Sequence, residues 1–176
     1  MPRKFFRKYH SNLEAVRSSR MVAAFGSWAQ HPNLWHLNRR SVSGAVAIGL
    51  FAGLVPGPLQ MLAALLLAVP LKKNLPVAML VTLYTNPFTI VPLYVLAYAY
   101  GRLLLPGEHA AFPASLEMGW ANLGDFLVAL GKPLALGLVA LGCTLAALGY
   151  VGVQLAWRGY VVAAWRARAR RRKAAA

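Results

Sequence analysis

The stretch "GLVPGPLQMLAAL", residues 53–65, places Pro56, Gly57 and Pro58 in the middle of a long apolar run. A second stretch, "YTNPFTIVPLY" at residues 84–94, does the same with Asn86 and Pro87. Proline removes a backbone N–H donor and breaks the hydrogen-bond ladder of a helix, and an unsatisfied backbone group is costly in an apolar environment. We therefore expect two apolar helices to be interrupted, one at each of these prolines.

The composition indicates a membrane protein. The 176 residues are 59% hydrophobic, yet they carry a net charge of +15, and a soluble domain is rarely both so apolar and so basic. Charged residues are absent from three stretches, 42–71, 74–101 and 133–157. Each stretch is longer than the roughly 20 apolar residues that cross a bilayer. The sequence therefore predicts an all-α integral membrane protein.

The charges predict how the chain is oriented. Lysine and arginine gather in residues 1–40, at Lys72–Lys73 and in "WRARARRRK" at residues 165–173, whereas three of the four acids lie within residues 102–132. Positive residues flank the cytoplasmic ends of membrane segments. We therefore expect a multi-pass membrane protein with cytoplasmic N- and C-termini, and a loop at 102–132 on the far side.

This orientation sets the course of the chain. Residues 42–71 would enter the membrane and return as a proline-broken re-entrant hairpin, while 75–101 and 133–157 would each cross as a transmembrane helix. Length agrees, because 42–71 as one straight helix would measure about 45 Å against an apolar core of about 30 Å. The alternative is a single tilted and kinked span over 42–71.

Three segments are expected along the chain. Residues 1–40 form a basic N-terminal interfacial segment, in which 12–29 is predicted as an amphipathic helix lying on the membrane surface. Residues 41–160 form the membrane domain, and 161–176 form a basic cytoplasmic tail. Because anionic lipid headgroups already explain an arginine-rich tail beside an apolar run, we expect the membrane and no nucleic acid as a partner.

The interruptions also predict a binding site. Asn86 is a good helix N-cap, Pro87 suits the first helical position and Thr89 the first turn, so a new helix is expected to begin inside the membrane. Gly57–Pro58 repeats this pattern. Helix N-termini attract anions, and two of them could converge on one pocket, as in secondary transporters. The alternative is that both kinks only shape packing, with neighbouring hydroxyls satisfying the backbone.

The predicted ligand-binding residues all lie at the two interruptions: Pro56, Gly57, Pro58, Gln60, Asn86, Pro87, Thr89 and Pro92. Headgroup contacts at the cytoplasmic surface are expected from Arg39, Arg40, Lys72 and Lys73. No acid lies in the apolar stretches, so neither a carboxylate-based metal site nor a cofactor is expected. An enzyme is not expected either, because the sequence shows no nucleophile with a nearby base and no paired carboxylates.

Several short motifs resemble one bacterial family. They are Leu34-Trp35, Asn38-Arg39-Arg40, Gly49, Gly53, Pro56, Pro58, Gln60, Asn74-Leu75-Pro76, Asn86-Pro87, Thr89 and Pro92-Leu93. Over about 32–101, and more weakly to the C-terminus, the chain resembles the family catalogued as domain of unknown function 2062. That family has no established activity, so the resemblance implies only the class. The layout of proline-broken apolar segments is also similar to that of DedA-type membrane proteins, which are linked to moving phosphate-bearing lipids.

Two functional hypotheses follow. In the first, a small inner-membrane protein binds an anionic lipid or lipid-linked phosphate in a pocket between its broken helices and assists its movement across the bilayer. In the second, it is a non-transporting adaptor or scaffold that holds partner proteins at the membrane. Glycines on the apolar stretches would in either case favour close helix packing, including in a homo-oligomer. Broken helices around a polar cavity would support the first hypothesis.

Overall fold

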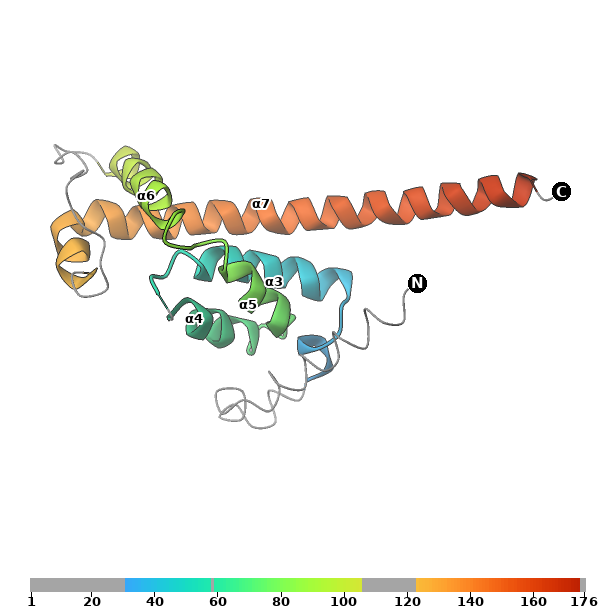
Figure 1. Ribbon diagram of the computed structural model, residues 1–176, viewed down its shortest axis with the longest axis horizontal. Coiled ribbons are helices and arrows are strands. Elements are labelled where there is room, and N and C mark those ends of the chain that lie inside the picture. Colours follow the sequence, from blue (N-terminus) through green and yellow to red (C-terminus); the bar gives the residue numbers. More distant parts are fainter. Residues whose placement is uncertain (1–30, 58, 106–122, 175–176) are drawn as a thin grey trace.

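The computed structural model describes residues 31–57, 59–105 and 123–174, and within these residues every regular element is helical. This confirms the all-α prediction for the described part of the chain (Figure 1). The elements are the 3-10 turn η2 (Pro32–Leu34) and the helices α3 (Arg39–Ala52), α4 (Leu59–Ala68), α5 (Leu75–Thr82), α6 (Ile90–Leu104) and α7 (Leu123–Ala174). The predicted surface helix at 12–29, Pro58 and most of the acidic loop lie outside the described residues.

Helices α3 and α4 form a hairpin. Asn38 begins α3 by accepting a hydrogen bond from the Ser41 N–H at 2.8 Å. After α3 the chain turns through Gly57, whose φ of 70° lies in the left-handed region that glycine tolerates best. Helix α4 then runs back, so that the Lys73 side chain, just after α4, lies against Gly44 near the start of α3.

The α4–α5 connection returns the chain to the start of α3. Lys73 N–H bonds to Ala68 C=O at 2.9 Å across Lys72, which has a φ of 53°, so α4 ends in a tight left-handed cap. Asn74 is fully buried, and its side chain caps α5 by accepting from the Val77 N–H at 3.0 Å.

Helix α5 runs parallel to α3. Along α3, Gly49 faces Ala78 and Val81 of α5, and Gly53 faces the Tyr84 ring just beyond it. The two helices therefore begin at one end of the molecule and finish together at the other.

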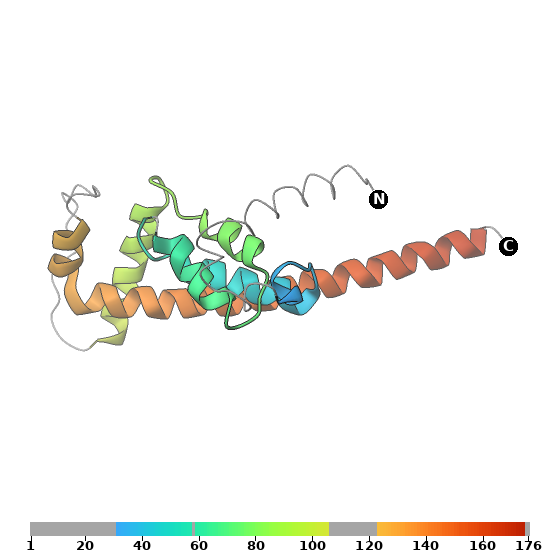
Figure 2. The same cartoon turned by 90° about the horizontal axis from the view of Figure 1, so that it is seen from below.

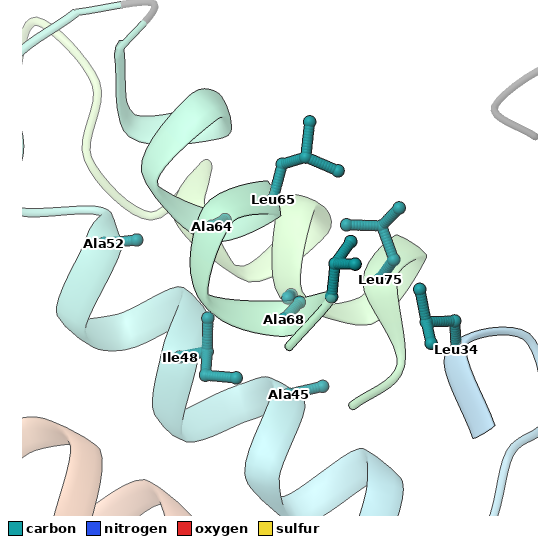
Figure 3. Packing of buried hydrophobic residues seen from close by; sticks show 10 residues of the cluster. Leu34, Ala45, Ile48, Ala52, Ala64, Leu65, Ala68 and Leu75 are labelled. Atoms are coloured by element: carbon teal, nitrogen blue, oxygen red, sulfur yellow. The ribbon is translucent and has the colours of Figure 1, made fainter. Parts of the chain in front are cut away.

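Small side chains let α3, α4 and α5 approach one another. Figure 3 shows their common core, where alanines of α3 and α4 face each other and larger side chains fill the edges. The ten buried members are Leu34, Ala45, Ile48, Ala52, Ala64, Leu65, Ala68, Val69, Leu75 and Ala78. Burying this apolar surface contributes about 25 cal/mol per Å².

Helix α6 crosses α7 instead of running alongside it (Figures 1 and 2). The backbones meet where Gly101 of α6 faces Gly137 of α7. A methyl group on Gly137 would overlap the carbonyl oxygen of Ala97, and one on Gly101 would overlap that of Pro133. Glycine is therefore required at both positions for this approach.

Helix α7 is antiparallel to α3. Gly142 faces Phe51 and Leu54 at the end of α3, whereas Gln154 reaches the start of α3 and donates to the Ser43 hydroxyl at 3.1 Å. The start of α3, the α4–α5 turn and the C-terminal half of α7 therefore share one end of the molecule.

The boundaries of α7 differ from those predicted. Helix begins at Leu123, inside the predicted loop 102–132, and is interrupted at Gly131, whose φ of 54° and ψ of −146° favour glycine. At the other end the helix continues through the predicted tail to Ala174. The change from apolar to basic residues near 157 predicts where the span ends, and the helix itself continues past that point because alanine and arginine are strong helix formers.

One helix of the described residues, Gly131–Arg168, is long and apolar enough to cross a membrane. Only 22% of its most apolar window is buried, whereas the core helix of a soluble protein would be mostly buried. This supports membrane association. Helices α3 to α6 have 14, 10, 8 and 15 residues, so each is shorter than the roughly 20 residues of a full span.

Candidate functional site

Both predicted interruptions are present. The chain leaves helix between α3 and α4, at residues 53–57, and again between α5 and α6, at residues 83–89. Because α3 and α5 are parallel, the two interruptions lie at the same end and touch. The Thr85 hydroxyl oxygen lies 2.7 Å from the Gly53 carbonyl oxygen and 2.6 Å from Oε1 of Gln60. We call this contact, between residues 53–60 and 82–89, the junction.

Hydroxyl groups following α5 satisfy the carbonyls at the end of α3. Tyr84 donates to Leu50 C=O at 2.8 Å, and Thr85 can donate to Gly53 C=O at 2.7 Å. The last carbonyls of a helix have no intrahelical partner, and leaving them unbonded in an apolar environment would be costly. The second interruption therefore supplies the hydrogen-bond donors that the carbonyls at the first interruption need.

Tyr94 of α6 supplies a donor to the next carbonyl along the chain, that of Leu54. It is fully buried, and its hydroxyl donates to Leu54 C=O at 2.9 Å. Neither Tyr84, Thr85 nor Tyr94 was among the predicted site residues. The available signal was three hydroxyl residues on either side of Asn86-Pro87, but the sequence does not show which carbonyls they reach.

Thr85 sits at the centre of the junction and is 8% exposed. Its hydroxyl oxygen is within hydrogen-bond distance of three acceptors, the third being Thr82 C=O at 3.0 Å. One hydroxyl has one proton, so it cannot donate fully to all three. Either Gln60 presents its oxygen and competes with Gly53, or its amide turns over and its NH₂ donates to the Thr85 oxygen.

Asn86 caps the turn that leads into α6. Its Oδ1 accepts from the N–H groups of Phe88 at 2.9 Å and Thr89 at 3.1 Å, and Thr89 Oγ1 accepts from the Asn86 N–H at 2.9 Å. This reciprocal pair is a capping box. The regular helix α6 nevertheless begins at Ile90 and not at Pro87. Thr89 also donates to Tyr84 C=O at 2.8 Å, which ties this turn to the second interruption.

The remaining predicted ligand residues lie around the rim of the junction. Asn86, Pro87 and Pro92 are exposed, whereas Pro56, Gly57, Gln60 and Thr89 are half-buried. The structure therefore brings the predicted residues of both interruptions to one end of the α3–α5 bundle. Pro58 lies outside the described residues.

The predicted headgroup residues lie elsewhere. Arg39 and Arg40 are exposed at the start of α3, Lys72 is exposed in the α4–α5 turn, and Lys73 is half-buried against Gly44. Gly53 comes twelve positions after Ser41, which corresponds to about 18 Å of helix, so α3 separates these four cations from the junction. The structure gathers each predicted set but keeps the two sets apart.

Most of the chain matches a known protein family. Residues 22–166 match the family described as an uncharacterized protein conserved in bacteria, DUF2062. The chain belongs to this family. The match includes both interruptions and extends well beyond the region on which the resemblance was based. No curated protein and no solved structure gives a significant match to this DUF2062 chain.

Proposed function

We propose that this DUF2062 chain is a multi-pass protein of the bacterial inner membrane that binds an anionic lipid or lipid-linked phosphate at the junction and assists its movement across the bilayer. The observation that carries the proposal is the direct contact between the two interruptions through Thr85, Gly53 and Gln60. Secondary transporters place their sites where discontinuous helices meet inside the membrane.

The course of the helices supports a re-entrant arrangement. The 14 residues of α3 extend about 21 Å, which is too short to cross an apolar core of about 30 Å, and α4 returns beside it. Lys73 lies against the start of α3, and α7 runs past this end of α3 toward its basic residues. The positive-inside rule assigns that end to the cytoplasm.

Two successive contacts then suit a phosphate-bearing lipid. The four cations at the cytoplasmic end attract the headgroup first. The junction lies one α3 length deeper, where the starts of α4 and α6 carry partial positive charge and Asn86 is exposed at the rim. The amide groups of Asn86 and Gln60 are the donors proposed to contact the phosphate.

A specific observation favours the second candidate, a membrane adaptor. The carbonyls of Leu50, Gly53 and Leu54 already have hydroxyl donors within the protein. Interruptions closed in this way are also what a purely structural kink requires. In that case the long basic end of α7 would be the part that binds partner proteins.

The deciding experiment separates capping from ligand binding at Asn86. Serine caps helices about as well as asparagine but lacks the amide, so Asn86→Ser keeps the turn and removes the proposed donor. We expect this variant, purified in mild detergent, to retain roughly tenfold less phospholipid or isoprenoid phosphate by mass spectrometry.

The matched control is Asn38→Ser, the same exchange at the exposed cap of α3, one helix length from the junction. It should retain lipid as the wild type does. Equal lipid in all three folded proteins would reject the lipid site and leave the adaptor.

Orientation has its own test. In a Cys143→Ser background, a membrane-impermeant maleimide should label Glu117→Cys in intact spheroplasts and label Leu71→Cys only after the membrane is opened. Leu71 is exposed beside Lys72, so its position in the protein does not protect it from the reagent. Labelling of Leu71→Cys from outside would refute the re-entrant arrangement.

A further inference from the structure

We infer that the junction is also a binding site for a monovalent cation of the sodium type, with Gly53 O, Gln60 Oε1 and Thr85 Oγ1 as its protein ligands. The Gly53 carbonyl and the Gln60 amide oxygen lie 2.7 Å and 2.6 Å from the Thr85 oxygen. All three are oxygen atoms, the ligand type that hard cations prefer. Gly53 and Thr85 are buried and Gln60 is half-buried.

Proton counting shows why these oxygens suit a cation. With the Gln60 oxygen facing Thr85, two acceptors compete for one hydroxyl proton, and the one that does not receive it has no donor among the hydrogen bonds of the described residues. A buried acceptor without a donor costs about 1–3 kcal/mol. A cation removes this deficit, because Thr85 can then donate its proton to Thr82 C=O at 3.0 Å while its lone pair joins the other two oxygens around the ion.

Two of the helix ends at the junction are C-termini, and the Gly53 carbonyl belongs to one of them. Helices α3 and α5 are parallel and both finish at the junction, at Ala52 and Thr82. Each helix C-terminus carries a partial negative charge of about half an electron. The cations at the start of α3 lie about 18 Å away along the helix, so their repulsion is much weaker than it would be at contact.

The ligand chemistry selects a monovalent ion. Calcium and magnesium sites are built with carboxylates, and residues 53–60 and 82–89 contain no acid. Burying a divalent charge without an opposite charge would be very costly. In secondary transporters, unwound carbonyls and the C-terminal ends of half-helices coordinate sodium, while half-helix N-termini face anionic groups. Both kinds of helix end occur at this junction.

This inference goes beyond the proposed lipid site and does not depend on it. The chain has no acid in its apolar stretches, so protonation of a carboxylate cannot drive movement of a ligand there. A carbonyl and hydroxyl cation site would supply ion coupling without any acid. Cation binding can be measured with no lipid added, so loss of the ion effect with normal lipid retention would reject this site alone.

The experiment compares the thermal unfolding of full-length protein in mild detergent, in sodium chloride and in N-methyl-D-glucamine chloride at equal ionic strength. An ion that binds only the folded state stabilises it by mass action. At about ten times its Kd, sodium should raise the Tm of the wild type by about 3–6 °C. An unchanged Tm would overturn the inference and support the network in which the Gln60 amide is turned over.

Three variants locate the effect. Gln60→Met keeps the chain length but lacks the oxygen, so its Tm should not respond to sodium. Gln60→Glu replaces the amide with a carboxylate, which cannot donate, and should respond at lower sodium concentrations than the wild type. Thr144→Val removes a hydroxyl that bonds within α7 and is not part of the junction, and it should respond as the wild type does. A full sodium response in folded Gln60→Met, or none in folded Gln60→Glu, would also overturn the site.

Discussion

The junction and the crossing of α6 over α7 are close contacts built in opposite ways. At the junction, polar side chains are added, and hydroxyls such as those of Tyr84 and Thr85 reach backbone carbonyls of another segment. At the crossing, side chains are absent, and Gly101 and Gly137 bring two backbones together. The junction should therefore fail when a polar atom is removed, and the crossing should fail when an apolar atom is added.

The largest effect is expected at the crossing. Gly137→Ala places a methyl group onto the Ala97 carbonyl oxygen, which belongs to the backbone and cannot move aside alone. Overpacking of this kind typically costs about 1–3 kcal/mol, and we expect a loss of stability at the upper end. Unfolding in detergent, followed by circular dichroism, measures it. Gly152→Ala is the control, because nothing lies within 4 Å of its added methyl group. Equal stability of the two variants would show that the backbones do not meet there.

The next effect belongs to the junction. Thr85→Val keeps the shape of the side chain but removes the donor to the buried Gly53 carbonyl. We expect a loss of about 1–3 kcal/mol in the free energy of unfolding. Thr144→Val removes an exposed hydroxyl that bonds to Ala140 C=O within its own helix, and should cost less than about 0.5 kcal/mol. If the two exchanges cost the same, the hydroxyl network is not what closes the junction.

A tyrosine pair refines this difference. Tyr84→Phe removes the donor to Leu50 C=O at 2.8 Å, near the end of α3, and should destabilise the protein by about 1 kcal/mol. Tyr100→Phe removes a longer, exposed contact of 3.3 Å with Thr144 between α6 and α7, so its effect should fall within about 0.5 kcal/mol of zero. Chemical denaturation in one detergent can rank the two. The reverse order would mean that hydroxyls matter more at the crossing than at the junction.

The smallest effect is expected beyond both contacts. Gly159 lies on the part of α7 past Gln154, and nothing lies within 4 Å of a methyl group added there. Alanine is favoured over glycine inside a helix by up to about 1 kcal/mol, so Gly159→Ala should leave stability unchanged or raise it slightly. A clear loss in the same unfolding assay would reveal a packing partner for this end of α7.

Local chemistry was predictable from the sequence, and long-range pairing was not. Proline placed both interruptions, and the Asn86 cap depends on residues only two or three positions away. In contrast, Tyr94 reaches Leu54 across 40 residues, and only the parallel course of α3 and α5 brings the interruptions together. The continuation of α7 through its basic residues follows from helix propensity, because charge governs where a residue is solvated and has little influence on whether the helix continues.

The candidate site was predicted in part. Gln60 and Asn86 do lie at the same end of the bundle, as expected from two matching helix starts. The motifs Gly57–Pro58 and Asn86–Pro87 indicate helix starts, which attract anions. The ends of α3 and α5, which come just before these starts, leave carbonyls and a partial negative charge, and the same motifs do not indicate them. Packing between segments decides whether a helix N-terminus or a helix C-terminus faces a given ligand. No local sequence motif predicts that packing.

The glycine pair at the crossing should also restrict which substitutions members of the family can accept. Every replacement of Gly101 or Gly137 adds atoms where two backbones already touch, so no single mutation at either position is harmless, and a compensating change would have to move a whole helix. Gly152 and Gly159 face open space and are under no such restriction. Among DUF2062 sequences, Gly101 and Gly137 should therefore be conserved, whereas Gly152 and Gly159 should vary. Conservation of the first pair would record the close contact between α6 and α7.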